Sequence, residues 1–324
     1  MDKLIEIINS SDKIAVVSHI DPDGDTLGGA LALAMGLNSL GKRTKVFCDG
    51  TVSYVYDFMP GIDSVRKLCE GDDGIDLAIA VDCADLGRLG DNITLFKSGV
   101  KTAGIDHHVS NTEFCDINIV DVDKSSSCEI VYHILQALGV KIDSEIATLL
   151  YVGISTDTGN FSYSNINKSC FVTAGELYEY DVDIPYISYM LYRRRTLAKT
   201  RLIGRAISNI KMYMDGSVSY MYIGADDLKE TKATESDFEG VVDYARDIIR
   251  VEVAICAKQV GPGCYKVNFR SQDKVDVQQI ARQYGGGGHK GAAGCTIREN
   301  FETTISEIIQ TVIRKLEECR QVEL

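Results

Sequence analysis

The sequence has 324 residues, 47 acidic and 34 basic, which gives a formal net charge of −13 at neutral pH. So acidic a chain is not expected to coat long duplex nucleic acid through a basic face, and ten scattered cysteines favour reduced thiols in the cytoplasm. The longest apolar stretch, near residues 27–37, is too short for the roughly 20 residues of a membrane-spanning helix, so no membrane role is expected.

The first half of the chain predicts an α/β domain with a mostly parallel sheet flanked by helices. Short apolar runs alternate with helical patterns, which is typical of βαβ units. The expected strands cover residues 13–18, 44–48, 76–81 and 101–105, and the expected helices cover 27–40, 126–138, 143–152 and 168–180. We place the boundaries of this domain at residues 1 and 185.

The second half predicts a smaller α/β domain, over residues 211–324, that is joined to the first by a helical linker at 186–210. Its expected strands cover residues 217–223, 251–258 and 265–270, and its expected helices cover 236–249, 275–283 and 305–318. The basic run 193–205 in the linker is most simply a solvent-exposed helix face. The alternative is an electrostatic entrance for oligonucleotides.

Four segments rich in aspartate or histidine follow apolar stretches of the first half. They are SHIDPDGD (18–25), VDCAD (81–85), IDHHVSN (105–111) and STDTGNF (155–161). Turn chemistry alone could explain the first of them, but three of the five histidines of the chain lie in these segments. Because the carboxyl ends of parallel strands meet at one edge of a sheet, where such folds bind ligands, we expect all four segments to face one crevice.

The carboxylates in these segments predict a metal site. Asp23, Asp25, Asp82 and Asp157 would repel one another without a bound cation. Mixed carboxylate and imidazole ligands suit Mn²⁺ or a related ion better than Ca²⁺. Asp23 and Asp25, two residues apart, can address two neighbouring ions, and Asp82 can bridge them, so we expect two divalent ions, with Mn²⁺ preferred.

The four segments, in this order, resemble the motifs of the DHH phosphoesterases, a family named for the sequence Asp106-His107-His108. The resemblance implies that one ion is held by His19, Asp23 and Asp82, and the other by Asp25, Asp82, His107 and Asp157. It also implies catalytic roles for Asp82 and for His108, which would lie beside the scissile phosphate and stabilise charge or assist the leaving oxygen. Asp106 is expected to orient a ligand.

The C-terminal stretch VNFRSQDKVDVQQIARQYGGGGHKGAAGC (267–295) resembles the DHH-associated domain, which implies a substrate-binding role. The glycines of residues 285–294 would let backbone amides approach a phosphate, with His289 adding a positive or donor group. A flexible loop or helix cap is the structural alternative. The residues expected to bind substrate are Arg270, Ser271, Gly287, Gly288 and His289.

Among the family, the compact two-domain chain most resembles the bacterial nano-RNase and pAp phosphatase group. This resemblance implies a hydrolase that degrades short oligoribonucleotides (nanoRNA) to mononucleotides and converts pAp to AMP. Phosphodiesterases of cyclic di-AMP and linear pApA remain the alternative. A non-catalytic nucleotide sensor is disfavoured because every expected metal-ligand position holds a side chain that can bind a metal ion. A pyrophosphatase is disfavoured because the pyrophosphatases of this kind carry a different second domain. The expected partners are short oligoribonucleotides or small adenine nucleotides, and a homodimer is left open.

Overall fold

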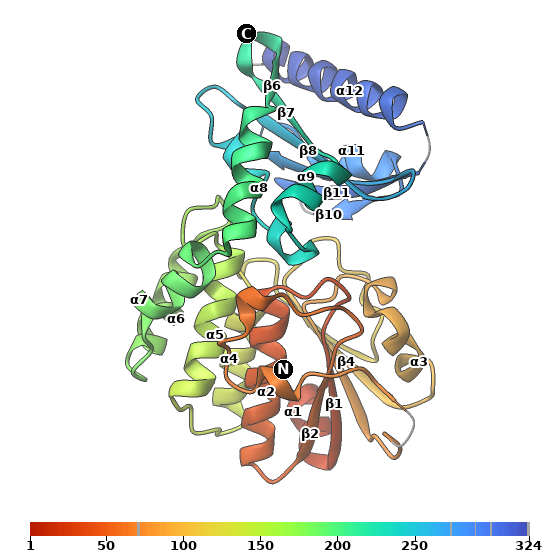
Figure 1. Ribbon diagram of the computed structural model, residues 1–324. Helices are drawn as coiled ribbons and strands as arrows, with labels where there is room; N and C mark the ends of the chain where they lie inside the picture. The colour runs from red at the N-terminus through yellow and green to blue at the C-terminus, as the bar shows by residue number, and fades with distance from the viewer. Residues whose placement is uncertain (70–71, 273, 289, 299, 323–324) are drawn as a thin grey trace. The chain divides into compact units, whose positions relative to one another are not determined.

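The computed structural model describes residues 1–69, 72–272, 274–288, 290–298 and 300–322 (Figure 1). The chain divides into two units, Met1–Arg194 and Arg195–Leu324, and each has its own sheet and its own hydrophobic cores. The predicted α/β class, with a parallel sheet followed by a second sheet domain, is confirmed. Within the described ranges, none of the helices combines the length and the apolar character needed to cross a bilayer.

The sheet of the first unit is entirely parallel and has the strand order β2-β1-β3-β4-β5. Its strands are β1 (Lys13–Val17), β2 (Arg43–Phe47), β3 (Leu77–Val81), β4 (Lys101–Asp106) and β5 (Ile117–Val120). Every residue of the central strand β3 is buried, as expected for a parallel sheet covered on both faces. The carboxyl ends of β1, β3 and β4 therefore lie at the same edge.

Helices cover both faces of this sheet (Figure 1). They are α1 (Asp2–Ser10), α2 (Gly24–Ser39), α3 (Ile93–Phe96), α4 (Ser127–Ala137), α5 (Ser144–Asp157), α6 (Lys168–Tyr178) and α7 (Ile184–Ser188), followed by a π-helical turn at Tyr189–Arg193. Glycines let α2, α4 and α5 approach closely, since a Cβ added to Gly28 would lie only 2.4 Å from the carbonyl oxygen of Leu149.

The second unit contains a six-stranded mixed sheet of order β10-β11-β9-β8-β7-β6. Its strands are β6 (Lys211–Tyr213), β7 (Val218–Ile223), β8 (Val253–Gly261), β9 (Cys264–Ser271), β10 (Gly287–Gly288) and β11 (Ala292–Arg298). Its helices are α8 (Leu197–Ser208), α9 (Ala225–Thr231), α10 (Asp243–Arg246), α11 (Val277–Gln283) and α12 (Phe301–Val322). One core packs α11 and α12 against the sheet, and another packs α8 and α10 against it.

Two expected elements of the second unit are wrong. The helix expected at 236–249 is a 3₁₀ turn at Glu235–Phe238 followed by the single turn of α10, because Gly240, with φ of +73°, interrupts the helical backbone. Residues 285–294, expected to be a loop, contain β10 and the start of β11, which pair in an antiparallel manner. Glycine is required there, since a Cβ on Gly286 would lie 2.0 Å from the carbonyl oxygen of Gly294.

Candidate metal centre

The four predicted segments lie at element ends of the first unit. His19 and Asp23 follow β1, Asp82 follows β3, and Asp106 is the last residue of β4. The fourth segment follows a helix and not a strand, because the helix expected at 143–152 runs on to Asp157 as α5.

All the predicted ligands come together in three overlapping sets. Within the described residues, the donor atoms of each set lie within 4.8 Å of one another. The sets are His19, Asp23 and Asp82; Asp25, His107 and Asp157; and Asp82, His107 and His108. Segments up to 138 residues apart in the sequence thus converge on one cluster whose chemistry fits a divalent metal ion.

Asp82 is the central residue of the cluster. Its Oδ2 lies 3.6 Å from Nε2 of His19, and its Oδ1 lies 3.6 Å from Nε2 of His107 and 3.5 Å from Nδ1 of His108. The two oxygens therefore face different sets. Its φ of 61° is a left-handed conformation, which residues with a side chain rarely adopt and which is often found at functional sites.

The imidazole of His107 is oriented for ligation. Its Nδ1 donates a hydrogen bond to the carbonyl oxygen of Lys124 at 3.2 Å, which leaves the lone pair on Nε2. Among the described residues, that buried Nε2 has no hydrogen-bond partner, and it lies 3.0 Å from the carboxylate of Asp157. A buried imidazole nitrogen of this kind fits a metal site, since buried polar atoms otherwise find partners.

Backbone amides hold the two carboxylates of the first segment. Asp23 caps α2 and accepts hydrogen bonds from the amides of Asp25 and Thr26, both at 3.1 Å. Asp25 is fully buried and accepts hydrogen bonds from the amides of Ser127 at 2.6 Å and Cys128 at 2.9 Å. Sequence reasoning missed this contribution of α4, although the pattern Ser126-x-x-Glu129 marks a helix start.

Asp106 contacts the paired histidines and belongs to none of the three donor sets. Its Oδ1 accepts hydrogen bonds from Nδ1 of His108 at 2.7 Å and from the amide of His107 at 2.9 Å. Its Oδ2 accepts a hydrogen bond from the side chain of Asn111, the last residue of the segment IDHHVSN, to which the sequence analysis gave no role of its own. Asp106 is therefore placed to fix the orientation of His108.

The charges of the cluster are strongly coupled. Burial disfavours the charged imidazole of His19, but the carboxylates of Asp23 and Asp82 outweigh burial and raise the pKa of His19 to about 9. Burial likewise opposes ionisation of Asp82, yet the neighbouring imidazoles hold the pKa of Asp82 well below its usual range. Burial, reinforced by the charge of Asp82, raises the pKa of Asp25 well above its usual value. A divalent cation would replace the protons that these side chains otherwise share.

Four of the five predicted substrate-binding residues lie on strands β9 and β10 of the second unit. Arg270 on β9 pairs with Asp243, with Nε and Oδ1 3.3 Å apart. The amide of Ser271 donates to the carbonyl oxygen of Gly291 at 2.8 Å, and Gly287 and Gly288 form β10. Since β11 pairs with both β9 and β10, these four residues lie on the two strands that flank β11. His289 lies outside the described residues.

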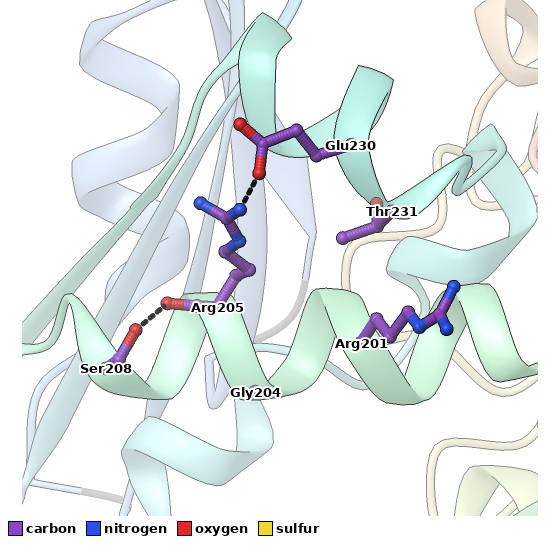
Figure 2. A pocket seen from close by; sticks show the side chains of 6 residues that line it. All are labelled: Arg201, Gly204, Arg205, Ser208, Glu230 and Thr231. Atoms are coloured by element: carbon purple, nitrogen blue, oxygen red, sulfur yellow. Dashed lines mark hydrogen bonds and ion pairs between the residues drawn. The ribbon is translucent and has the colours of Figure 1, made fainter.

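Two of the six basic residues in the run 193–205 form ion pairs with carboxylates. Arg194 pairs with Asp57 at 2.6 Å, and Arg205 pairs with Glu230 and Asp227. Figure 2 shows Arg205 and Arg201 beside a shallow pocket of about 390 Å³ between α8 and α9. The hydroxyl of Ser208 in this pocket donates to the carbonyl oxygen of Arg205.

Comparisons with known proteins agree with the motifs. Residues 13–154 match the DHH family, N-terminal domain, and residues 215–318 match the DHHA1 domain. The bifunctional oligoribonuclease and PAP phosphatase NrnA of Thermus thermophilus is 32% identical over 94% of this chain and 90% of its own. The Bacillus subtilis protein of the same name is 29% identical over 91% of this chain and 92% of its own.

Solved structures share the fold. An exopolyphosphatase-related protein from Bacteroides fragilis has a TM-score of 0.89 at 26% identity and covers 99% of this chain and 96% of its own. RecJ from Thermus thermophilus in complex with Mn²⁺ has a TM-score of 0.58 at 17% identity, covering 96% of this chain and 54% of its own. The chain therefore belongs to the DHH family of phosphoesterases, with a DHH domain followed by a DHHA1 domain.

Proposed function

We propose that this protein is a metal-dependent phosphoesterase that hydrolyses short oligonucleotides to mononucleotides and pAp to AMP. The observation that carries the proposal is the convergence of four aspartates with His19 and with His107, whose buried Nε2 has no hydrogen-bond partner among the described residues. The names of the relatives from Thermus thermophilus and Bacillus subtilis, which are similar over nine tenths of the chain, support these two substrates.

Two divalent ions, with Mn²⁺ preferred, are the proposed cofactors. His19, Asp23 and Asp82 would hold one ion, and Asp25, Asp82, His107 and Asp157 would hold the other. Bound ions of this kind lower the pKa of a water nucleophile and neutralise the charge that develops on a phosphate. A RecJ structure of the same fold contains Mn²⁺, which supports this choice of ion.

The remaining roles fall to the side chains around this centre. Asp106 holds Nδ1 of His108 at 2.7 Å and so fixes the imidazole that we place beside the scissile phosphate. There His108 would donate a hydrogen bond or a proton to a phosphate or leaving-group oxygen. Arg270, Ser271, Gly287, Gly288 and His289 are the proposed substrate-binding residues of the second unit.

We also propose a preference for short substrates and a cytoplasmic location. A net charge of −13 offers no general attraction to a long polyanion, so only locally held phosphates contribute to binding. All ten cysteines are free thiols, which fits a reducing compartment.

A substrate panel tests the proposed function. The protein is incubated with Mn²⁺ and, separately, with pAp, pApA, cyclic di-AMP, oligonucleotides of two to five residues, a 24-mer and pyrophosphate. We expect mononucleotide release from the short oligonucleotides and AMP from pAp, with much slower turnover of the 24-mer at equal concentration of ends. Preferential turnover of cyclic di-AMP, or of pyrophosphate, would replace the proposed function with that activity. No hydrolysis of any substrate would favour a sensor.

A further inference from the structure

A serine that the sequence analysis did not single out lies directly beside the candidate metal centre. Ser127 is the first residue of α4 and is fully buried. Its amide donates to Oδ2 of Asp25 at 2.6 Å, and its hydroxyl donates to Oδ1 of Asp82 at 3.0 Å. One residue therefore contacts two carboxylates that come from different elements.

The two carboxylates lie in different sets of donor atoms, and both are proposed ligands of the second ion. Asp25 lies with His107 and Asp157, whereas Asp82 lies with His19 and Asp23 and also with His107 and His108. The N-terminus of α4 holds both carboxylate oxygens of Asp25. The amide of Ser127 donates to Oδ2, and the amide of Cys128 donates to Oδ1 at 2.9 Å. The partial positive charge of a helix N-terminus stabilises an ionised carboxylate at this position.

Asp82 needs support from its surroundings. Its left-handed backbone, with φ of 61°, persists only where neighbouring contacts enforce it. The hydroxyl of Ser127, at 3.0 Å, is closer to this carboxylate than the imidazoles of His19 and His107, which are both 3.6 Å away. The hydrogen bond fixes the plane of the carboxylate, so that Oδ1 faces His107 and Oδ2 faces His19.

We propose that Ser127 is a positioning residue that locks the carboxylates of Asp25 and Asp82 relative to each other before a metal ion binds. The inference rests on the proposed function, because it concerns the same metal centre. It goes beyond that function by assigning the preformed geometry of both ligand sets to a single side chain. Partners that orient metal ligands typically change metal affinity by about 10- to 100-fold when they are removed.

The neighbouring residue provides a matched control. Ser126 is as buried as Ser127, but its hydroxyl accepts a hydrogen bond from the amide of Glu129 and caps α4. Ser126→Ala therefore removes a helix cap, whereas Ser127→Ala removes the hydrogen bond to Asp82. Mn²⁺ binding to the metal-free full-length protein, measured by calorimetry without substrate, is compared for both variants, together with melting temperature and the Mn²⁺ dependence of turnover.

We expect Ser127→Ala to weaken Mn²⁺ binding by about 10- to 100-fold. The Mn²⁺ concentration needed for turnover should rise with it, while kcat in saturating Mn²⁺ stays within a few-fold of wild type. Ser126→Ala should melt at a lower temperature and bind Mn²⁺ with wild-type affinity. Wild-type affinity in Ser127→Ala, or equal losses in both variants, would overturn the proposal.

Two further features of the experiment keep the role of Ser127 testable. If Ser127→Ala does not fold, Ser127→Thr and Ser127→Val have the same shape and differ in the hydroxyl, so the threonine variant should bind Mn²⁺ more tightly. Equal affinities in that pair would also refute the role of Ser127. The binding measurement contains no substrate, so a wild-type protein that hydrolyses neither oligonucleotides nor pAp would refute the proposed function and leave the result for Ser127 standing.

Discussion

Gly153 links the packing of the helices to the metal centre, and Gly153→Ala should damage both. A Cβ at this position would lie 2.2 Å from Sγ of Cys128 and 2.7 Å from Oδ1 of Asp25. Neither neighbour can retreat easily, because Cys128 is buried in α4 and both oxygens of Asp25 are held by amides of that helix. The substitution therefore either pushes α5 away from α4 or displaces Asp25.

The expected change in the free energy of unfolding of Gly153→Ala is the balance of two effects. Alanine is favoured over glycine inside a helix by about 0.5–1 kcal/mol. Inserting a methyl group into a close-packed core costs about 1–3 kcal/mol. We therefore expect Gly153→Ala to lower the free energy of unfolding by up to about 2.5 kcal/mol. Mn²⁺ affinity should fall as well, because Asp25 is a proposed ligand.

Gly175 in α6 provides the control for this measurement. Apart from the local helix backbone, none of the described residues has an atom within 4 Å of a Cβ added there, so Gly175→Ala should gain about 0.5–1 kcal/mol from helix propensity alone. Both variants are measured by urea denaturation of the metal-free protein and by Mn²⁺ titration. If Gly153→Ala is as stable as Gly175→Ala and binds Mn²⁺ like wild type, the packing argument is refuted.

Three further predictions concern the paired histidines, the second unit and acid stability. His107→Ala should lower Mn²⁺ stoichiometry, whereas His108→Ala should retain the ions and lower kcat; equal metal loss in both would contradict these roles. Arg270→Ala should raise KM for short oligonucleotides by about 10- to 100-fold and leave hydrolysis of bis-p-nitrophenyl phosphate unchanged. Parallel loss of activity on both substrates would disprove a binding role for Arg270. Hydrogen bonds from the amide and hydroxyl of Thr102 lower the pKa of the Asp116 carboxyl, so its contribution to stability is present above the unfolded pKa of about 4 and is lost as pH falls through the folded value. Asp116→Ala should therefore lower the melting temperature at pH 7, and the difference from wild type should shrink below pH 4.

The edge of the parallel sheet was predictable from the sequence because its signals are local. The apolar runs before Asp82 and Asp106 are short and bounded by turn residues, and both become strands of the first unit. Once the strands are parallel, the residues that follow them must lie at one edge. The clustering of His19, Asp82 and His107 therefore follows from pattern and topology together.

Features that depend on distant contacts were not predictable in this way. The helix expected at 143–152 runs on to Asp157, and only the folded chain shows that the end of this helix reaches the same cluster as the strand ends. The strand β11 pairs with β9, and the sequence of residues 285–298 does not by itself predict that pairing. The contacts of Ser127 with Asp25 and Asp82 span 102 and 45 residues, so only the folded chain reveals them.

The central claim is that the cluster around Asp82 carries out metal-dependent phosphoester hydrolysis. Turnover of a trinucleotide and of pAp in saturating Mn²⁺ should be compared for wild type, Asp82→Asn and the control Asp85→Asn, which removes a nearby carboxylate that caps a 3₁₀ helix. We predict that Asp82→Asn loses about 100-fold or more in kcat on both substrates and that Asp85→Asn stays within a few-fold of wild type. Near-normal turnover by Asp82→Asn would contradict the account.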